Sequence, residues 1–108
     1  VTVLGAPPTN GADTITAIGS SSTSPSAGSD QFGLRLIASG GSGSVTASYG
    51  SSGFAYGASA TSSDTVATES TGDAIDTNYS VRYVVNITPT KSSGSYSTNI
   101  VYVVTANF

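Results

Sequence analysis

The chain from Asn78 to Thr88 reads NYSVRYVVNIT and carries the strongest secondary-structure signal of the sequence. Every second residue from Tyr79 to Ile87 is apolar or aromatic, and most residues between them are polar. This two-residue period is typical of a β-strand with one buried and one solvated face. The next seven residues, PTKSSGS, are typical of a loop, and the stretch YSTNIVYVVTANF after them alternates again. The sequence therefore predicts a long antiparallel hairpin at this end of the chain.

Shorter strand signals precede this stretch. QFGLRLIAS places Phe32, Leu34 and Leu36 on one face and Arg35 on the other, and SVTASYG, GFAYG and DTVATES are three further short candidates. Turn residues recur about every 8–12 residues, and no helical period lasts three turns. We therefore expect an all-β protein, an antiparallel β-sandwich of the Ig-like or pilin-like kind.

The first thirty residues differ from this pattern. Residues 1–18 contain two short strand-like pieces, VTVL and DTITAI, separated by a segment that includes Pro7 and Pro8. Residues 19–30 have the Gly/Ser-rich composition of a flexible linker. The sequence thus predicts three parts: an N-terminal strand extension, a linker, and a β-sandwich body over residues 31–108.

The composition narrows the function classes. Charged residues make up 8% of the chain, against about 25% in a typical soluble domain. The net charge of −3 with only three Lys and Arg residues excludes a basic nucleic-acid-binding surface. No apolar run approaches about 20 residues, so we expect no membrane span. The many Ser and Thr residues favour an extracellular or cell-surface protein, mature after removal of a signal segment.

The common catalytic groups are missing. The chain has no His and no Cys, which excludes the usual Ser–His triad, thiol chemistry and the main transition-metal ligands. We therefore expect no enzyme activity and no cofactor. Some surface β-sandwiches form a Lys–Asn isopeptide crosslink by themselves, but that chemistry needs a buried lysine beside an acid. Lys91 lies in the predicted loop PTKSSGS, where we expect it to be exposed.

Two kinds of weaker site signal remain. Four acidic residues could supply oxygen ligands to calcium, although their spacing matches no known loop and is equally typical of solvated turns; they are Asp64, Glu69, Asp73 and Asp76. Two Asn-x-Ser/Thr sequons make Asn78 and Asn86 candidate glycosylation sites.

One feature of the predicted hairpin is unusual. Val84, Val101 and Val103 make its second face apolar too, whereas a strand face in water is normally polar. Either the protein's own loops cover this face, or another chain does.

The C-terminal run GSYSTNIVYVVTANF (Gly94–Phe108) resembles the last strand of spore coat protein U-type domains and archaic chaperone–usher pilins. The longer pattern over residues 29–108 is also similar to secreted β-rich surface proteins of candidate-phyla-radiation bacteria. The first resemblance implies polymerisation by donor-strand complementation, in which the extension of one subunit fills a groove of the next. The cysteine pair usual in those pilins is absent here.

Two hypotheses follow. In the first, the protein is a structural subunit of an extracellular filament or pilus, and its partners are copies of itself. Its interface would then involve Val1, Val3, Leu4, Ile15, Ile18, Val84, Val101 and Val103. In the second, it is a monomeric adhesin-type β-sandwich that folds its first strand back onto itself and binds host or cell-surface glycans or another protein.

Overall fold

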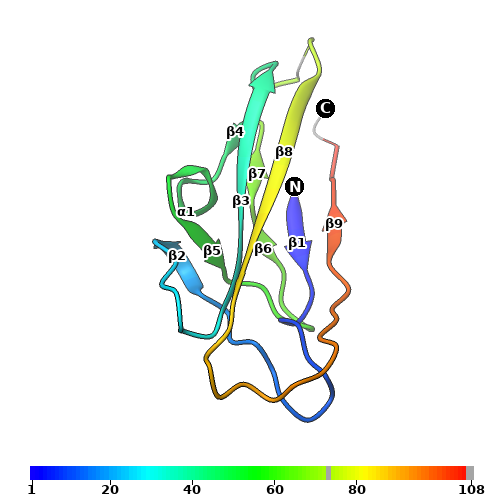
Figure 1. The fold of residues 1–108 in the computed structure, drawn as a ribbon. Helices are drawn as coiled ribbons and strands as arrows, with labels where there is room; N and C mark the ends of the chain where they lie inside the picture. The colour runs from blue at the N-terminus through cyan, green and yellow to red at the C-terminus, as the bar shows by residue number, and fades with distance from the viewer. Residues whose placement is uncertain (73, 107–108) are drawn as a thin grey trace.

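The computed structural model describes residues 1–72 and 74–106, and it shows an all-β fold (Figure 1). Within these residues the elements, in chain order, are β1 (Thr2–Leu4), β2 (Gly19–Thr23), β3 (Gln31–Gly40), β4 (Ser44–Val45), α1 (Ala47–Gly50), β5 (Phe54–Tyr56), β6 (Asp64–Thr65), β7 (Ala67–Thr68), β8 (Thr77–Asn86) and β9 (Val101–Val103). They form a four-stranded sheet in the order β2-β5-β3-β8, a three-stranded sheet in the order β6-β1-β9, and the pair β4-β7. The predicted all-β fold class is confirmed.

β3 and β8 form the long antiparallel ladder at the centre of the fold (Figure 1). The two strands pair over their full length, from Gln31 opposite Asn86 to Gly40 opposite Thr77. As predicted, the apolar face of β3 is buried: Phe32, Leu34 and Leu36 are at most 3% exposed. Because β3 buries one face and pairs with strands on both edges, it organises the core around itself.

The predicted hairpin is wrong in its pairing. β8 pairs with β3, and β9 pairs with β1 in the other sheet. The physical reason is length: β3 offers β8 a ten-residue partner, whereas only three residues of the C-terminal stretch are strand. The chain between β8 and β9 crosses to the second sheet, where Ser97 and Thr9 exchange backbone hydrogen bonds of 3.0 Å.

The N-terminal segment also differs from the expected division of the chain. Val3 and Ile15, at 0% and 3% exposure, belong to the same core as β3. The expected linker begins with β2, which pairs with β5 although all its residues are exposed. Its Ser and Thr residues can join an edge strand through backbone hydrogen bonds alone. In the single chain, residues 1–30 are therefore part of the folded body.

The stretch SVTASYG, predicted as a strand, instead divides into β4 and the single-turn helix α1. The Thr46 carbonyl accepts hydrogen bonds from the Tyr49 and Gly50 N–H groups, at 2.8 and 2.9 Å. This turn directs the Tyr49 ring into the core, where it is 1% exposed. The Tyr49 hydroxyl donates to Asp64 Oδ2 at 2.6 Å and accepts from the Gly57 N–H at 3.0 Å.

A glycine is required where the chain leaves β1. Gly5 has a φ of +151°, and a Cβ at this position would lie 2.5 Å from the Asn99 backbone oxygen. The Gly5 carbonyl accepts a hydrogen bond of 2.7 Å from the buried Tyr56 hydroxyl. A side chain here would clash with backbone, so this close approach fixes the exit of β1 toward Pro7 and Pro8.

A stabilising substitution follows from the β3–β8 ladder. Arg35 lies directly opposite Arg82, and like charges opposite each other destabilise a strand pair. Arg35 also contacts the Phe54 ring, and its Nε lacks a hydrogen-bond partner in the described part of the chain. We expect Arg82→Glu to raise the free energy of unfolding by about 0.5 kcal/mol. Urea denaturation measures this, with Arg82→Gln as the uncharged control; a less stable Glu than Gln variant would contradict it.

Candidate functional site

Two strand edges that pair with no other strand of the described residues expose apolar side chains. β8 and β9 are each the last strand of their sheet. Tyr83, Val85 and Ile87 at the end of the first sheet are 49–55% exposed, and from the second sheet the exposed residues are Val101, Val103 and Val104. Tyr83 and Val85 lie on the face of β8 that was predicted to be buried, and Ile87 directly follows the strand. In that face the structure half-buries only Tyr79 and Val81.

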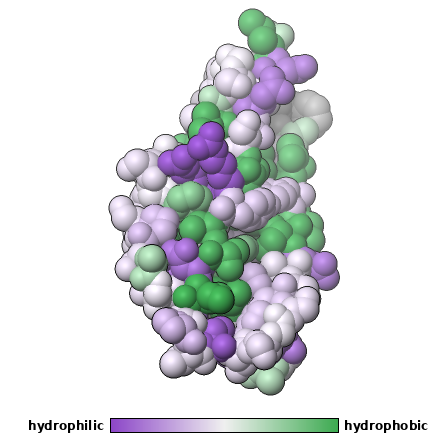
Figure 2. All heavy atoms as spheres, viewed as in Figure 1, coloured by the Kyte–Doolittle hydropathy of each residue, from purple (hydrophilic) through white to green (hydrophobic). Residues whose placement is uncertain are grey.

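The two edges meet at one point. The Tyr83 and Tyr102 hydroxyls lie 2.7 Å apart and share a hydrogen bond. In Figure 2, which shows the molecule from the side of Figure 1, green apolar side chains gather in a broken band through the middle of the face. We call the exposed apolar residues of β8 and β9, with the flanking Ile87 and Val104, the apolar edge surface.

β1 fills a slot between β6 and β9 (Figure 1). It is antiparallel to both: Val3 lies opposite Asp64 on one side and Tyr102 on the other. The Val66 N–H donates to the Val1 carbonyl at 3.0 Å, and the Val1 nitrogen donates to the Ala67 carbonyl at 2.7 Å. Within this slot Thr2 and Val3 are therefore paired with a strand on both sides, and the Val3 side chain is fully buried.

The residues predicted to form a subunit interface fall into three groups. The structure buries Val3 and Ile15 in the core of their own chain, leaves Val1, Leu4, Ile18 and Val84 half-buried, and exposes Val101 and Val103. In the β1–β9 ladder Leu4 lies opposite Val101 and Val3 opposite Tyr102, while Val84 belongs to the other sheet. Of these eight residues, only the two β9 valines combine high exposure with the apolar character that a partner would cover.

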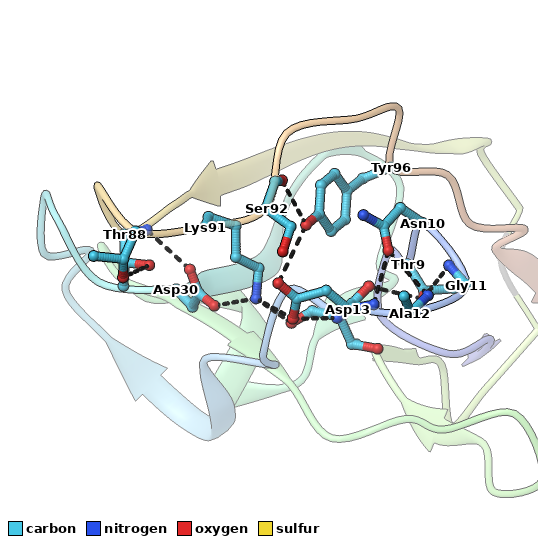
Figure 3. Close-up of polar contacts among 12 residues, drawn as sticks. Thr9, Asn10, Gly11, Ala12, Asp13, Asp30, Thr88, Lys91, Ser92 and Tyr96 are labelled. Carbon is cyan, nitrogen blue, oxygen red and sulfur yellow. Dashed lines mark hydrogen bonds and ion pairs between the residues drawn. The ribbon is translucent and has the colours of Figure 1, made fainter.

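A second candidate site surrounds Lys91, and here the expectation of an exposed lysine is wrong (Figure 3). The Lys91 side chain is 8% exposed and lies between two carboxylates. Its Nζ donates to Asp13 Oδ1 at 2.9 Å, to the Thr14 carbonyl at 2.6 Å, and to Asp30 Oδ2 at close range. The cluster joins three segments far apart in sequence, because Asp13 precedes β2, Asp30 precedes β3, and Lys91 follows β8.

Further donors orient the two acids of the Lys91 cluster. The Thr88 N–H donates to Asp30 Oδ1 at 2.9 Å. The Tyr96 hydroxyl lies 3.4 Å from Asp13 Oδ2 and donates to the Ser92 carbonyl at 3.0 Å. The hydrogen bond with Lys91 holds the pKa of each carboxyl below its ordinary value, and the two carboxylates raise the lysine pKa. At neutral pH the cluster is therefore one cation between two anions.

The calcium candidates do not converge in the described residues. Asp64 accepts hydrogen bonds from the Tyr49 hydroxyl and the Thr65 N–H, and Glu69 Oε1 accepts from the Ser70 and Thr71 N–H groups. No group of three or more acidic residues in residues 1–72 and 74–106 could hold a metal ion. The fourth candidate, Asp73, lies outside the described residues.

The two sequon asparagines differ in surroundings. Asn78 is exposed on β8, whereas the half-buried Asn86 donates through Nδ2 to Gln31 Oε1 at 3.1 Å and to the Ser26 carbonyl at 3.3 Å. Attachment of a sugar at Asn86 would remove at least one of these bonds, so Asn78 is the more accessible candidate.

Comparison with known proteins assigns no family and no function to this chain. No protein-family model, curated protein or solved structure matches the chain. The resemblance of the C-terminal run to pilin-type strands therefore stays a prediction. Among the described residues, no helix is long and apolar enough to cross a membrane.

Sequence reasoning missed both polar clusters. The Tyr49–Asp64 bond joins a residue of the helical turn to β6, and nothing in the local pattern links these positions. The Lys91 cluster had one signal: this chain has a single lysine, and a lone lysine in a chain with few charges is expected to pair with an acid, although the sequence does not indicate which one.

Proposed function

We propose that this protein is a structural subunit of an extracellular filament, joined to copies of itself by strand exchange. In this proposal β1 of one copy occupies, in the next copy, the slot between β6 and β9. The single observation that carries the proposal is that slot, in which the first strand is hydrogen-bonded on both edges and buries Val3 completely.

The slot would accept β1 of a second copy, because all copies have the same sequence. Any β1 that enters it presents the same TVL sequence, the same antiparallel register and the same buried valine. Exchange of an identical element between copies is a low-cost route to association, because each hydrogen bond broken within one chain forms again between two chains. A head-to-tail exchange that does not close on itself produces a filament.

Exchange requires that more than β1 moves. The Ala6 carbonyl accepts from Thr98 Oγ1, and Thr9 is bonded to Ser97, so the chain after β1 is held to its own body. Residues 1–18 would have to transfer as a unit, with Ile15 and Asp13 finding in the neighbour the places they hold here. The exposed segment from β2 to β3 could then act as the connection between bodies.

The apolar edge surface supports assembly independently of exchange. The apolar edge surface lies on two strands that are edges of their sheets in the described chain. An open strand edge is a typical site of β-augmentation, in which another strand adds through main-chain hydrogen bonds. A neighbouring copy held by strand exchange could cover this surface.

A second candidate function is a monomeric cell-surface binding module. The observation that favours it is the position of β1 in its own chain, which already completes the three-stranded sheet without a partner. In this case the apolar edge surface, rather than a strand slot, would meet the ligand.

A disulfide reporter distinguishes the two candidates. The chain has no cysteine, and Thr2 lies opposite Thr65 in the β1–β6 ladder. A double variant, Thr2→Cys with Thr65→Cys, is refolded at high concentration and oxidised, then analysed on a non-reducing denaturing gel. Strand exchange links residue 2 of one chain to residue 65 of another, so we expect a ladder of dimers and higher species.

The matched control places cysteines at Ile37 and Ser80, an exposed pair in the β3–β8 ladder that does not exchange. We expect this variant to give internally linked monomers only. If the Thr2/Thr65 variant also gives monomers only, strand exchange is refuted and the monomeric module is favoured.

A further inference from the structure

The Lys91 cluster holds an ammonium group in contact with two carboxylates, and one proton transfer would convert the ammonium and the Asp30 carboxylate into an amine and a carboxylic acid. The lysine amine touches the carboxyl group of Asp30, and a second carboxyl group, that of Asp13, is bonded to the same Nζ. The lysine side chain is 8% exposed, and the side chains of Asp13 and Asp30 are 34% and 19% exposed. Water therefore has limited access to the lysine nitrogen.

We propose that Lys91 and Asp30 form an intramolecular isopeptide bond, with Asp13 as the proton-transfer residue. The bond joins Nζ to the Asp30 side-chain carbon and releases one water molecule. It needs no oxidant, cofactor or partner, because condensation of an amine with a carboxylic acid changes no oxidation state.

The step balances from the ion pair that the structure shows. One ammonium proton passes to the Asp30 carboxylate across their contact, which gives a neutral amine and a neutral acid. The amine lone pair then attacks the Asp30 carbonyl carbon. Asp13 takes a second proton from the nitrogen and delivers it to the hydroxyl of Asp30, which leaves as water. Asp13 ends as the carboxylate it was, and the third proton stays on the amide nitrogen.

The surroundings match these roles. The Thr88 N–H donates to Asp30 Oδ1 at 2.9 Å, so it can stabilise negative charge that develops on this oxygen during attack, as an oxyanion-hole donor does. Asp13 is held by the Thr14 N–H at 2.9 Å and approached by the Tyr96 hydroxyl at 3.4 Å. Fixed contact between reacting groups replaces a bimolecular encounter by an intramolecular one, which lowers the entropic part of the barrier.

The alternative is that the cluster stays an ion pair. A chain with the isopeptide bond and a chain with the ion pair differ in mass by one water molecule, so mass spectrometry distinguishes them. Lys91 and Asp30 both lie outside residues 1–18, and on strand exchange the Asp13 of the neighbouring copy would take the place that Asp13 holds here. The bond can therefore form whether β1 remains in its own chain or is exchanged, and its failure would leave the assembly proposal untouched.

The test is the intact mass of the purified full chain, with peptide mapping of the product. We expect a mass lower than the sequence mass by one water molecule, and a branched peptide that joins Lys91 to Asp30. Full sequence mass for the folded wild-type chain after prolonged incubation would overturn the proposal. A branch to Asp13 in place of Asp30 would overturn the assignment of the acceptor.

Three variants complete the test. Lys91→Arg keeps the positive charge without the amine nucleophile, and Asp13→Asn removes the proton carrier while the acceptor remains; we expect both to keep their full mass. Asp76→Asn, an exposed acid outside the cluster, should lose one water like the wild type. Circular dichroism shows whether each variant folds. If the Asp13→Asn variant does not fold, the mass of the wild-type chain still decides the proposal. Water loss in the Lys91→Arg variant would contradict the proposal.

Discussion

Replacement of Val3 by aspartate is expected to lower the free energy of unfolding by more than about 4 kcal/mol, because a charge or a protonated acid would then occupy a fully buried apolar site. Val3 has no exposed surface, and it lies between the β6 and β9 ladders in the sheet that holds β1. Domains of this size are stable by about 5–15 kcal/mol. A loss of that size is a large part of this stability, and a lower urea midpoint followed by tyrosine fluorescence measures it.

The matched control is Val101→Asp on the neighbouring strand. Val101 is 51% exposed, so its replacement should change the stability of the single chain by less than about 0.5 kcal/mol. The same change should weaken any association through the apolar edge surface. Equal stability losses for the two variants would mean that β1 is not part of the core, contrary to the structure.

The second large effect is a loss of stability at alkaline pH. Burial raises the pKa of Tyr49, and its hydrogen bond to Asp64 raises it further. In the unfolded chain the tyrosine ionises near its ordinary value of about 10. Below that pH both states hold the proton, and this group adds no pH dependence. Above it the unfolded state loses protons first, so stability falls by up to about 1.4 kcal/mol per pH unit until the folded tyrosine also ionises.

The measurement is a series of urea denaturation curves from about pH 8 upward, a range set around the ordinary tyrosine pKa of about 10. Tyr49→Phe should be less stable than wild type at neutral pH, because Asp64 and the Gly57 N–H lose a partner. It should also show a flatter decline at high pH, so that the two curves approach each other. Burial also raises the pKa of Tyr56, Tyr96 and Tyr102. A wild-type-like slope in the Tyr49→Phe variant would therefore assign the effect to these other tyrosines.

The parts of the fold that sequence predicts well are those where one strand face is buried along its whole length. Phe32, Leu34 and Leu36 alternate without interruption, so the pattern gives both the strand and its buried face. β8 shows the limit of this reasoning. It has an equally clear alternation, but Tyr83 and Val85 remain about half exposed, although Tyr83 shares a hydrogen bond with Tyr102 of β9.

Pairing could not be predicted because alternation says which residues share a face and nothing about which strand lies beside them. The stretch after Lys91 was expected to return along β8, yet it joins β1 in the other sheet. Likewise, the Gly/Ser/Thr composition of the segment after Ile18 is the same in a free linker and in the edge strand β2. Backbone hydrogen bonds decide between these outcomes, and the pattern of side chains does not predict which backbone groups will pair.

The candidate site was predicted only in part. The sequence predicted the apolar second face of β9, because Val101 and Val103 occupy positions where an alternating strand would have polar residues. The sequence did not predict the Lys91 cluster. Asp13 and Asp30 are 17 positions apart and Asp30 and Lys91 are 61 positions apart, so these residues meet only in the folded chain. Long-range polar contacts of this kind depend on topology.

The antiparallel pairing of the first and last strands also sets how this protein would respond to tension. Thr2 lies opposite Val103, so forces that pull these two ends apart act across the ladder and load its hydrogen bonds one after another. Such a sheet peels open at low force. The β3–β8 ladder lies beyond that point in the load path. A chain pulled at these two ends would therefore lengthen first by releasing its smaller sheet.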